Sequence, residues 1–218
     1  YLGAENLLPE HLESYQLTCD IDLMSHKLSI CANLFYNKLR DFIYRIPEAS
    51  GDDIRYKNAG MLKLTGIEGE ASLLLQKMKI HANICILSVL DSKDYGVTDD
   101  KIDNIPPLTA NMLASYNILK RNKTNVIVSA NLRYASQQSA PLNTHLNGTP
   151  YVNPDNTTPE RLLADASTMI LFKELIRLKI TVSNLFNKKY EQGGSVNFPY
   201  PQKGRWYKIS LSLKIKNV

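Results

Sequence analysis

The sequence of 218 residues contains no long apolar run. No stretch approaches the roughly 18 consecutive apolar residues that a membrane helix needs. If the chain meets a membrane, it must therefore cross it with strands or lie on its surface. Hydrophobic residues make up 44% of the chain and charged residues 22%. Both values are close to the globular average, so composition alone does not distinguish a soluble domain from a membrane protein.

Cysteine is scarce, and its placement excludes a disulfide scaffold. Cys19, Cys31 and Cys85 are far apart, form no CxxC pair and are odd in number. An odd number of cysteines cannot form a closed set of disulfides. We expect the three thiols to act as small buried or lipid-facing hydrophobic groups rather than as redox or metal ligands.

Patterns for nucleic-acid binding and for catalysis are missing as well. The net charge is +5, but the basic residues are spread singly, whereas a nucleic-acid surface needs a clustered stripe of Lys and Arg. The four histidines are isolated, and none belongs to an HExxH motif. We therefore predict that the chain is not an enzyme and binds no metal, cofactor or nucleic acid.

What the sequence does contain is a repeated alternation of apolar and polar residues. Between Tyr207 and Ile215, each second residue is apolar and the residues between are Lys or Ser. This period of two is typical of a strand with one apolar and one polar face. Its length of about nine residues suits a tilted strand that crosses a bilayer. The same pattern recurs at 15–23, 28–36, 66–75, 80–86, 110–118, 126–134 and 178–182.

One segment, 160–172, carries two competing patterns. Thr158-Pro159-Glu160 resembles a helix start, and the apolar residues that follow have helical spacing. The even-numbered residues from Ala164 to Phe172 also provide a mostly apolar strand face. The sequence leaves strand and helix open here, and we favour the strand because its neighbours are strands.

The connections between these segments alternate strictly in length. An antiparallel meander places every second connection on the same side, and outer-membrane barrels have long loops outside and short turns inside. The alternation predicts an all-β fold, an antiparallel transmembrane β-barrel meander of about nine strands. An odd number does not suit a complete bacterial barrel, so we expect a piece of a larger one. Short connections lie at 24–26, 76–78, 120–124 and 173–176, and long ones at 46–54, 92–106, 138–160 and 187–203.

Three stretches carry a more specific pattern. Asn6-Leu7-Leu8-Pro9-Glu10 precedes a strand, Asn58-Ala59-Gly60 precedes Gly66-Ile67-Glu68, and Asn184-Leu185-Phe186 precedes Tyr190 and Gly204-Arg205. In order and spacing they resemble TonB-dependent outer-membrane receptors over essentially the whole chain. We expect the motif residues to have structural roles. They are Pro9, Glu10, Asn58, Gly60, Gly66, Glu68, Asn184, Phe186, Tyr190, Gly204 and Arg205.

The resemblance implies both an architecture and a function. Residues 1–218 would form the C-terminal part of a barrel of about 22 strands, without the family's N-terminal plug domain. The function would be uptake of a scarce, bulky nutrient across the bacterial outer membrane, with a ferric siderophore as the first expectation and haem or cobalamin as others. The expected partners are outer-membrane lipid and TonB, the latter through the missing N-terminal part.

Aromatic residues in the long connections are the candidate cargo contacts, because rings stack on large ligands. Packing within the loops explains the same residues equally well. Two other functional classes remain open, namely a smaller porin-like outer-membrane barrel and a soluble β-sandwich binding module. The candidate cargo contacts are Tyr95, Tyr151, Tyr190, Phe198 and Tyr200.

Overall fold

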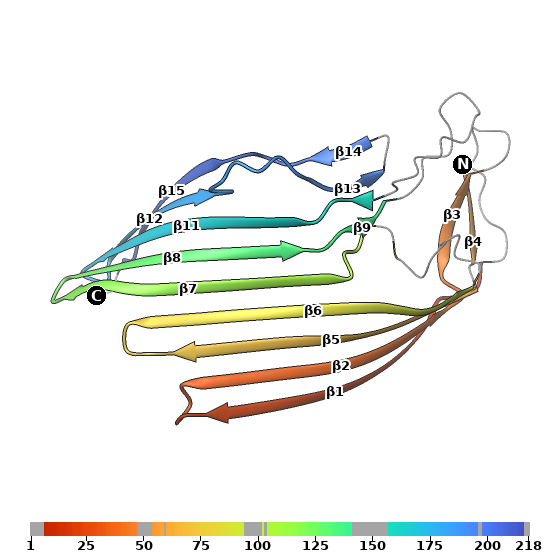
Figure 1. Ribbon diagram of the computed structural model, residues 1–218, viewed down its shortest axis with the longest axis horizontal. Helices are drawn as coiled ribbons and strands as arrows, with labels where there is room; N and C mark the ends of the chain where they lie inside the picture. Colours follow the sequence, from red (N-terminus) through yellow and green to blue (C-terminus); the bar gives the residue numbers. More distant parts are fainter. Residues whose placement is uncertain are drawn as a thin grey trace.

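Nine long strands form one antiparallel sheet in which the strand order follows the chain (Figure 1). The computed structural model describes residues 7–47, 54–58, 60–93, 102, 104–140, 157–195 and 198–215. Within these residues, no helix is long and apolar enough to cross a membrane. The nine strands are β1 (His11–Leu23), β2 (Leu28–Arg40), β5 (Met61–Leu74), β6 (Met78–Lys93), β7 (Leu108–Arg121), β8 (Thr124–Ala135), β11 (Arg161–Phe172), β12 (Ile176–Ser183) and β15 (Trp206–Leu213).

The predicted strands are confirmed, including the ambiguous segment. Residues 161–172 form β11, which pairs with β8 on one side and with β12 on the other. Ala166 lies opposite Ala130, and Thr168 lies opposite Val128. The period-two face therefore matches the faces of both neighbours, and pairing on two edges outweighs the local helix signal.

The alternation of the connections is also confirmed. The short turns all lie at one end of the sheet, called the turn end, and the long connections all lie at the other, called the loop end (Figure 1). Three long connections carry a small hairpin of their own. These hairpins are β3 (Ile43–Pro47) with β4 (Ile54–Asn58), β9 (Gln138–Ser139) with β10 (Thr157–Thr158), and β13 (Glu191–Ser195) with β14 (Phe198–Pro201).

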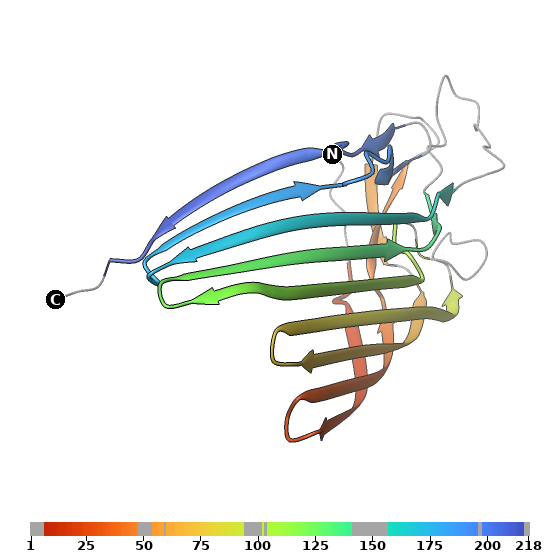
Figure 2. The same ribbon diagram turned by 60° about the vertical axis from the view of Figure 1, so that its left-hand side comes forward.

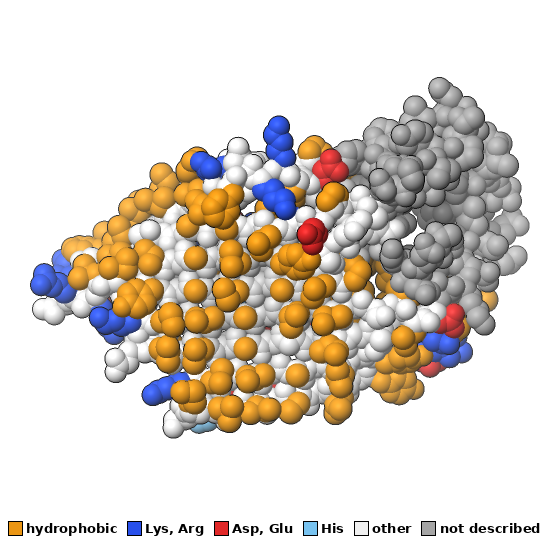
Figure 3. Space-filling model, viewed as in Figure 1, with side chains coloured by type: hydrophobic (Ala, Val, Ile, Leu, Met, Phe, Trp, Pro, Cys, Tyr) orange, Lys and Arg blue, Asp and Glu red, His pale blue; other side chains and the backbone are white. Residues whose placement is uncertain are grey.

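One face of the sheet is apolar over its whole width (Figure 3). Residues directly opposite on neighbouring strands point to the same face, and Ile30, Ala71, Ala82 and Met112 form one such row. Side chains on this face are open to the surroundings; Ile209, for example, is 72% exposed. Soluble proteins rarely expose so large an apolar surface. In the described part of the chain no second sheet packs on this face, which argues against a β-sandwich.

Buried hydrophobic residues are few among the described residues, and the main cluster lies at the loop end. Phe42 and Leu62 are each 6% exposed and pack with Leu39, Leu64, Val89 and Ile102. Figure 2 shows the rest of the sheet as a single twisted and curved layer. This layer is held by its strand ladders, which is typical of the wall of a barrel.

Candidate functional site

The first two sequence motifs meet at the loop end, around the side chain of Asn58. The Leu8 backbone N donates to Asn58 Oδ1 at 2.7 Å, and Asn58 Nδ2 donates to Leu8 O at 2.9 Å. Asn58 Nδ2 also donates to Asp41 O. An amide can donate and accept at once, so this side chain joins the segment before β1 to the end of β4.

Glu10 and Gly60 belong to the same structure. Glu10 Oε1 accepts a hydrogen bond from the backbone N of Ile43 at 2.7 Å, where β3 begins. Asp41 N donates to Gly60 O at 3.3 Å. Pro9 lies beside Glu10 and is exposed. We call this group the Asn58 cluster; it comprises Leu8, Glu10, Asp41, Ile43, Asn58 and Gly60.

Gly66 and Glu68 lie on the polar face of β5 and have separate roles. A Cβ atom at Gly66 would lie 2.3 Å from Phe35 Cζ and 2.5 Å from Ile86 O, so only glycine fits. Phe35 pairs with Gly66, which explains why this aromatic residue interrupts the polar alternation of β2. Glu68 Oε2 accepts from Asn33 Nδ2 at 3.1 Å.

The third motif is organised by Asn184, which is 3% exposed. Its Nδ2 donates to Lys188 O at 2.7 Å and to Lys203 O at 3.4 Å, and its Oδ1 accepts from Lys188 N at 2.8 Å. Asn184 has a φ of 51°, a conformation that asparagine tolerates better than most residues. The side chain therefore closes the turn after β12 and ties it to the segment that leads into β15.

A carboxylate that the sequence analysis missed supports this arrangement. Asp165 on β11 accepts from the backbone N of Asn184 at 2.9 Å, from Arg133 Nε and Nη2 at 3.0 Å each, and from Asn131 Nδ2 at 3.3 Å. Its side chain is 13% exposed. The available signal was an acidic residue between two alanines on a strand, but the pairing with Arg133 depends on strand register.

Gly204 and Arg205 act through their backbones. Arg205 N donates to Asn187 Oδ1 at 2.8 Å, and a Cβ at Gly204 would lie 2.5 Å from the same oxygen. Phe186, in contrast, is 77% exposed. Asn187 was also missed, because nothing in the sequence separates it from other loop asparagines. We call this group the Asn184 cluster; it comprises Asn131, Arg133, Asp165, Asn184, Asn187, Lys188, Lys203, Gly204 and Arg205.

A pocket of about 640 Å³ lies beside the Asn184 cluster at the loop end. Gln202 N donates to Tyr190 O at 3.0 Å, which holds its two sides together. Tyr134 Oη donates to Glu160 Oε2 at 2.9 Å at another margin. The lining combines two ammonium groups, two carboxylates, an aromatic ring and an amide, so it offers charge-assisted hydrogen bonds and a stacking surface for a flat ring. Its lining is Pro159, Glu160, Asn187, Lys188, Lys189, Tyr190, Glu191, Pro201, Gln202 and Gly204.

Of the five predicted cargo contacts, the structure places Tyr190 in the lining of this pocket, and Tyr200 is not in that lining. Tyr95 and Tyr151 lie outside the described residues. Phe198 and Tyr200 lie in β14, and the side chain of Tyr200 is 63% exposed. All five remain predictions.

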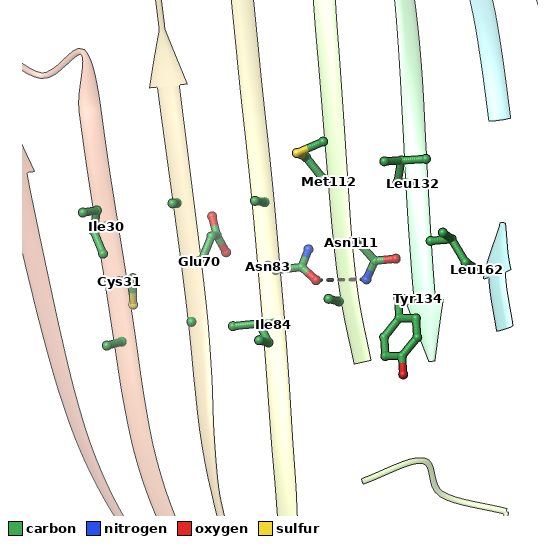
Figure 4. Close-up of a pocket in the computed structure, with 15 residues that line it drawn as sticks. Ile30, Cys31, Glu70, Asn83, Ile84, Asn111, Met112, Leu132, Tyr134 and Leu162 are labelled. Carbon is green, nitrogen blue, oxygen red and sulfur yellow. Dashed lines mark hydrogen bonds between the residues drawn. The ribbon is translucent and has the colours of Figure 1, made fainter. Parts of the chain in front are cut away.

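A second depression, of about 480 Å³, lies on the apolar face and crosses strands β2 to β11 (Figure 4). Small residues, including Ala32, Gly69 and Ala82, form its floor between larger ones such as Met112 and Leu162. This lining and position fit hydrocarbon chains better than polar cargo. The hydrogen bond drawn in Figure 4 joins Asn111 Nδ2 to Asn83 Oδ1 at 2.9 Å and belongs to the polar face.

Metal-ligating side chains are not gathered into a site in the described residues. No group of three or more His, Cys, Asp or Glu in this part of the chain is arranged to hold a metal ion. Cys19, Cys31 and Cys85 are free thiols. Cys19 is exposed on the apolar face, whereas Cys31 and Cys85 are half-buried on the polar face.

Comparison with known proteins gives consistent structural neighbours. The fold resembles the ferric-catecholate import receptor Fiu from K12 E. coli, with a TM-score of 0.69 and 16% identity over 95% of this chain and 28% of that one. It resembles the copper transporter OprC with a TM-score of 0.74 and 19% identity over 95% and 31%. For the siderophore receptor PiuA from Acinetobacter baumannii the values are 0.69 and 17%, over 93% and 28%.

These structures establish the fold alone, because the identities are low and the chain spans less than a third of their length. No curated protein matches the sequence. A family model does match, however. Residues 1–185 fit the family described as "TonB dependent receptor-like, beta-barrel". The chain therefore belongs to the β-barrel family of TonB-dependent receptors, whose members are transporters of the bacterial outer membrane and not enzymes.

Proposed function

We propose that residues 1–218 form the C-terminal part of the barrel wall of a receptor that imports a scarce, bulky nutrient, with a ferric siderophore as the cargo. The observation that carries this proposal is the pocket at the loop end, where Lys188, Lys189 and Tyr190 meet. In outer-membrane barrels the long loops are extracellular, so this pocket faces the side from which cargo arrives. The structural neighbours Fiu and PiuA are described as a ferric-catecholate import receptor and a siderophore receptor.

The chemistry of the pocket favours an anionic, aromatic ligand such as a ferric catecholate. The two ammonium groups provide charge-assisted hydrogen bonds, and the Tyr190 ring provides a stacking surface. Glu160 and Glu191 in the same lining oppose an anion. The Glu160 carboxylate accepts a hydrogen bond from the Tyr134 hydroxyl but keeps its negative charge, so the two lysines would act on the ligand through direct charge-assisted hydrogen bonds.

The proposed boundaries extend beyond the residues that the family model matches. β15 pairs with β12 along eight residue positions, from Ile176 opposite Leu213 to Ser183 opposite Trp206. It is therefore part of the same sheet as the eight preceding strands. This continuity supports one barrel segment over residues 1–218, and the uptake of cargo would draw energy from TonB.

The proposal is tested by uptake of a radiolabelled ferric catecholate in cells that have no other receptor for it. We expect uptake to require TonB, and we expect the triple variant Lys188→Ala, Lys189→Ala and Tyr190→Ala to weaken cargo affinity by at least about tenfold. Tyr207→Ala is the matched control, since this ring lies on the apolar face. Unchanged uptake in the triple variant, or uptake without TonB, would contradict the proposal. If the receptor supported growth on haem or cobalamin but not on the ferric catecholate, the cargo would be haem or cobalamin and not a siderophore.

A further inference from the structure

The turn end of the main sheet carries many more basic than acidic side chains. The residues listed below lie in a short turn, within three strand residues of one, or directly after β15, and all are exposed. At the loop end, in contrast, acidic and basic residues are mixed and several form ion pairs. The turn end is therefore strongly positive. Its basic residues are Lys27, Lys77, Lys79, Lys120, Arg121, Lys123, Lys173, Arg177 and Lys214, and its acidic residues are Asp22 and Glu174.

These basic side chains have no counter-charge of their own. In the described part of the chain, none of them forms an ion pair. The Asp22 carboxylate lies 3.4 Å from His26 Nδ1, on a strand that is four strands away from β7. Glu174, beside Lys173, is a single carboxylate among many cations. An anion from outside the chain would therefore relieve the repulsion between the cations.

Part of this charge lies at the margin of the apolar face. Arg121 lies opposite Thr124, and Thr124 lies opposite Phe172. Residues directly opposite each other share a face, and Phe172 is on the apolar face, where it is 41% exposed. The Arg121 guanidinium and the Thr124 hydroxyl therefore belong to the apolar side of the wall. Figure 3 shows Lys and Arg side chains along this margin of the apolar face.

The Lys173 side chain lies at the same margin. Its Nζ is over the Phe172 ring, 5.5 Å from the ring centroid. The backbone N of Lys173 donates to Lys123 O at 2.6 Å, so the turn after β11 lies beside the turn after β7. Two strand spacings of about 4.8 Å separate Arg121 from Phe172, roughly 10 Å. The long side chains of Arg121 and Lys173 can therefore contact one phosphate group from its two sides.

The surroundings of these cations favour a lipid over an acidic protein as the partner. Ile176 and Leu213 continue the row of paired residues on the apolar face, and Val126 and Ile170 form the next row toward the loop end. A ligand at this margin therefore meets cations on one side and an apolar surface on the other. A phospholipid has an anionic phosphate and hydrocarbon chains in the same molecule, whereas an acidic protein would leave the apolar rows without a partner.

We infer that the turn end of this wall binds a phospholipid with an anionic headgroup, whose phosphate contacts Arg121, Thr124 and Lys173 and whose chains lie along Phe172 and Ile176. The long loops of outer-membrane barrels are extracellular, so this lipid belongs to the periplasmic leaflet. A guanidinium, an ammonium and a hydroxyl are all donors to phosphate oxygens. Basic clusters beside a membrane-spanning segment also attract anionic lipids from a distance. The inference concerns the apolar side of the wall and does not depend on the cargo.

The inference is tested with the intact receptor in micelles of a neutral detergent, where native mass spectrometry counts the bound lipid molecules. We expect phosphatidylglycerol to bind about tenfold more tightly than phosphatidylcholine, which has the same phosphate but no net charge. The double variant Arg121→Gln and Lys173→Gln should remove most of this preference. Lys179→Gln with Lys208→Gln is the matched control, because it removes the same charge from the polar face and should leave the preference unchanged.

Three results of this binding experiment would overturn the inference. The first is equal binding of the two phospholipids, and the second is an equal loss of the preference in the control variant. The third is displacement of the lipid by inorganic phosphate at equal concentration, which would indicate a site for a free anion. A salt series on the parent protein needs no variant, so it decides the question even if the double variant does not fold. We expect high salt to weaken the preference, and a preference that salt leaves unchanged would also contradict the inference.

A photo-crosslinker at Ile176 in cells distinguishes a lipid partner from a protein partner. Ile176 lies opposite Phe172, and we expect mass spectrometry to find phospholipid adducts in which anionic headgroups are enriched. Ile209, in the middle of the apolar face and 72% exposed, is the control position and should show no such enrichment. An acidic protein crosslinked at Ile176, or the same headgroup composition at both positions, would contradict the inference.

Discussion

The Asn58 cluster and the Asn184 cluster use the same amide chemistry in opposite settings. Asn58 bonds to Leu8, fifty positions away in the sequence, and is only half-buried. Asn184 bonds to Lys188, four positions away, is 3% exposed and rests on the Asp165 carboxylate. The Asn58 cluster joins distant segments at a site that water reaches, so water can replace a hydrogen bond that is lost. The Asn184 cluster holds one long connection in place at a buried site, where water cannot replace a lost hydrogen bond.

The largest expected effect comes from removing the two amides. Asn184→Ala leaves the backbone groups of Lys188 without their side-chain partner in a buried position, and we expect it to lower the free energy of unfolding by about 3 kcal/mol. Asn58→Ala should cost about 2 kcal/mol, since water reaches its partners. Denaturant unfolding of the protein in lipid vesicles measures both. Equal losses would show that burial does not separate the clusters.

The two motif glycines sharpen the same comparison. A Cβ at Gly66 meets the Ile86 backbone and the Phe35 ring, whereas at Gly204 it meets the amide oxygen at the end of the Asn187 side chain, which can rotate away. We expect Gly66→Ala to cost about 2 kcal/mol, a typical result of overpacking, and Gly204→Ala about half of that. The temperature at which the folded form is lost, followed by gel migration, ranks the two. A larger loss from Gly204→Ala would contradict the assignment.

The smallest expected effect concerns the two carboxylates that support the clusters. Asp165→Asn keeps the shape but turns a donor toward Arg133 or Asn184, and we expect a loss of about 1 kcal/mol or less, because Arg133 is 41% exposed and solvent screens the pair. Glu10→Gln can still accept from Ile43 and should have a smaller effect. Unfolding in parallel with Asn184→Ala is informative, since a double variant should lose less than the sum. If the losses in the free energy of unfolding of the two single variants add up fully in the double variant, Asp165 does not act together with the Asn184 cluster.

Many of the strands of the wall could be predicted from the sequence, because each strand is marked by a pattern within its own few residues. Alternation with a period of two defines a strand and its faces, and the segment ending at Phe172 needed only its neighbours to decide it. The contacts of Asn58 with Leu8 and of Asp165 with Arg133 could not be predicted in this way. They depend on which residues the register brings opposite each other, and a one-residue slip would separate them.

The candidate pocket was even less accessible to sequence reasoning. Tyr190 was singled out as a ring in a long connection, but Lys188, Lys189 and Gln202 carried no pattern of their own. They meet because Asn184 and Asn187 fold the connection back on itself. Side chains that form hydrogen bonds with backbone groups are hard to recognise in a single sequence, because the backbone partner can belong to any residue type.

The strand order has a consequence for how such a wall can change in length. If the small hairpins are left aside, each strand of the main sheet forms hydrogen bonds only with the main-sheet strands that come directly before and after it along the chain. Loss or duplication of a whole hairpin would thus leave every later loop on its original side of the membrane. Loss of a single strand would send all later loops to the wrong side. The hairpin is therefore the unit of insertion and deletion, which agrees with the even strand numbers of bacterial barrels.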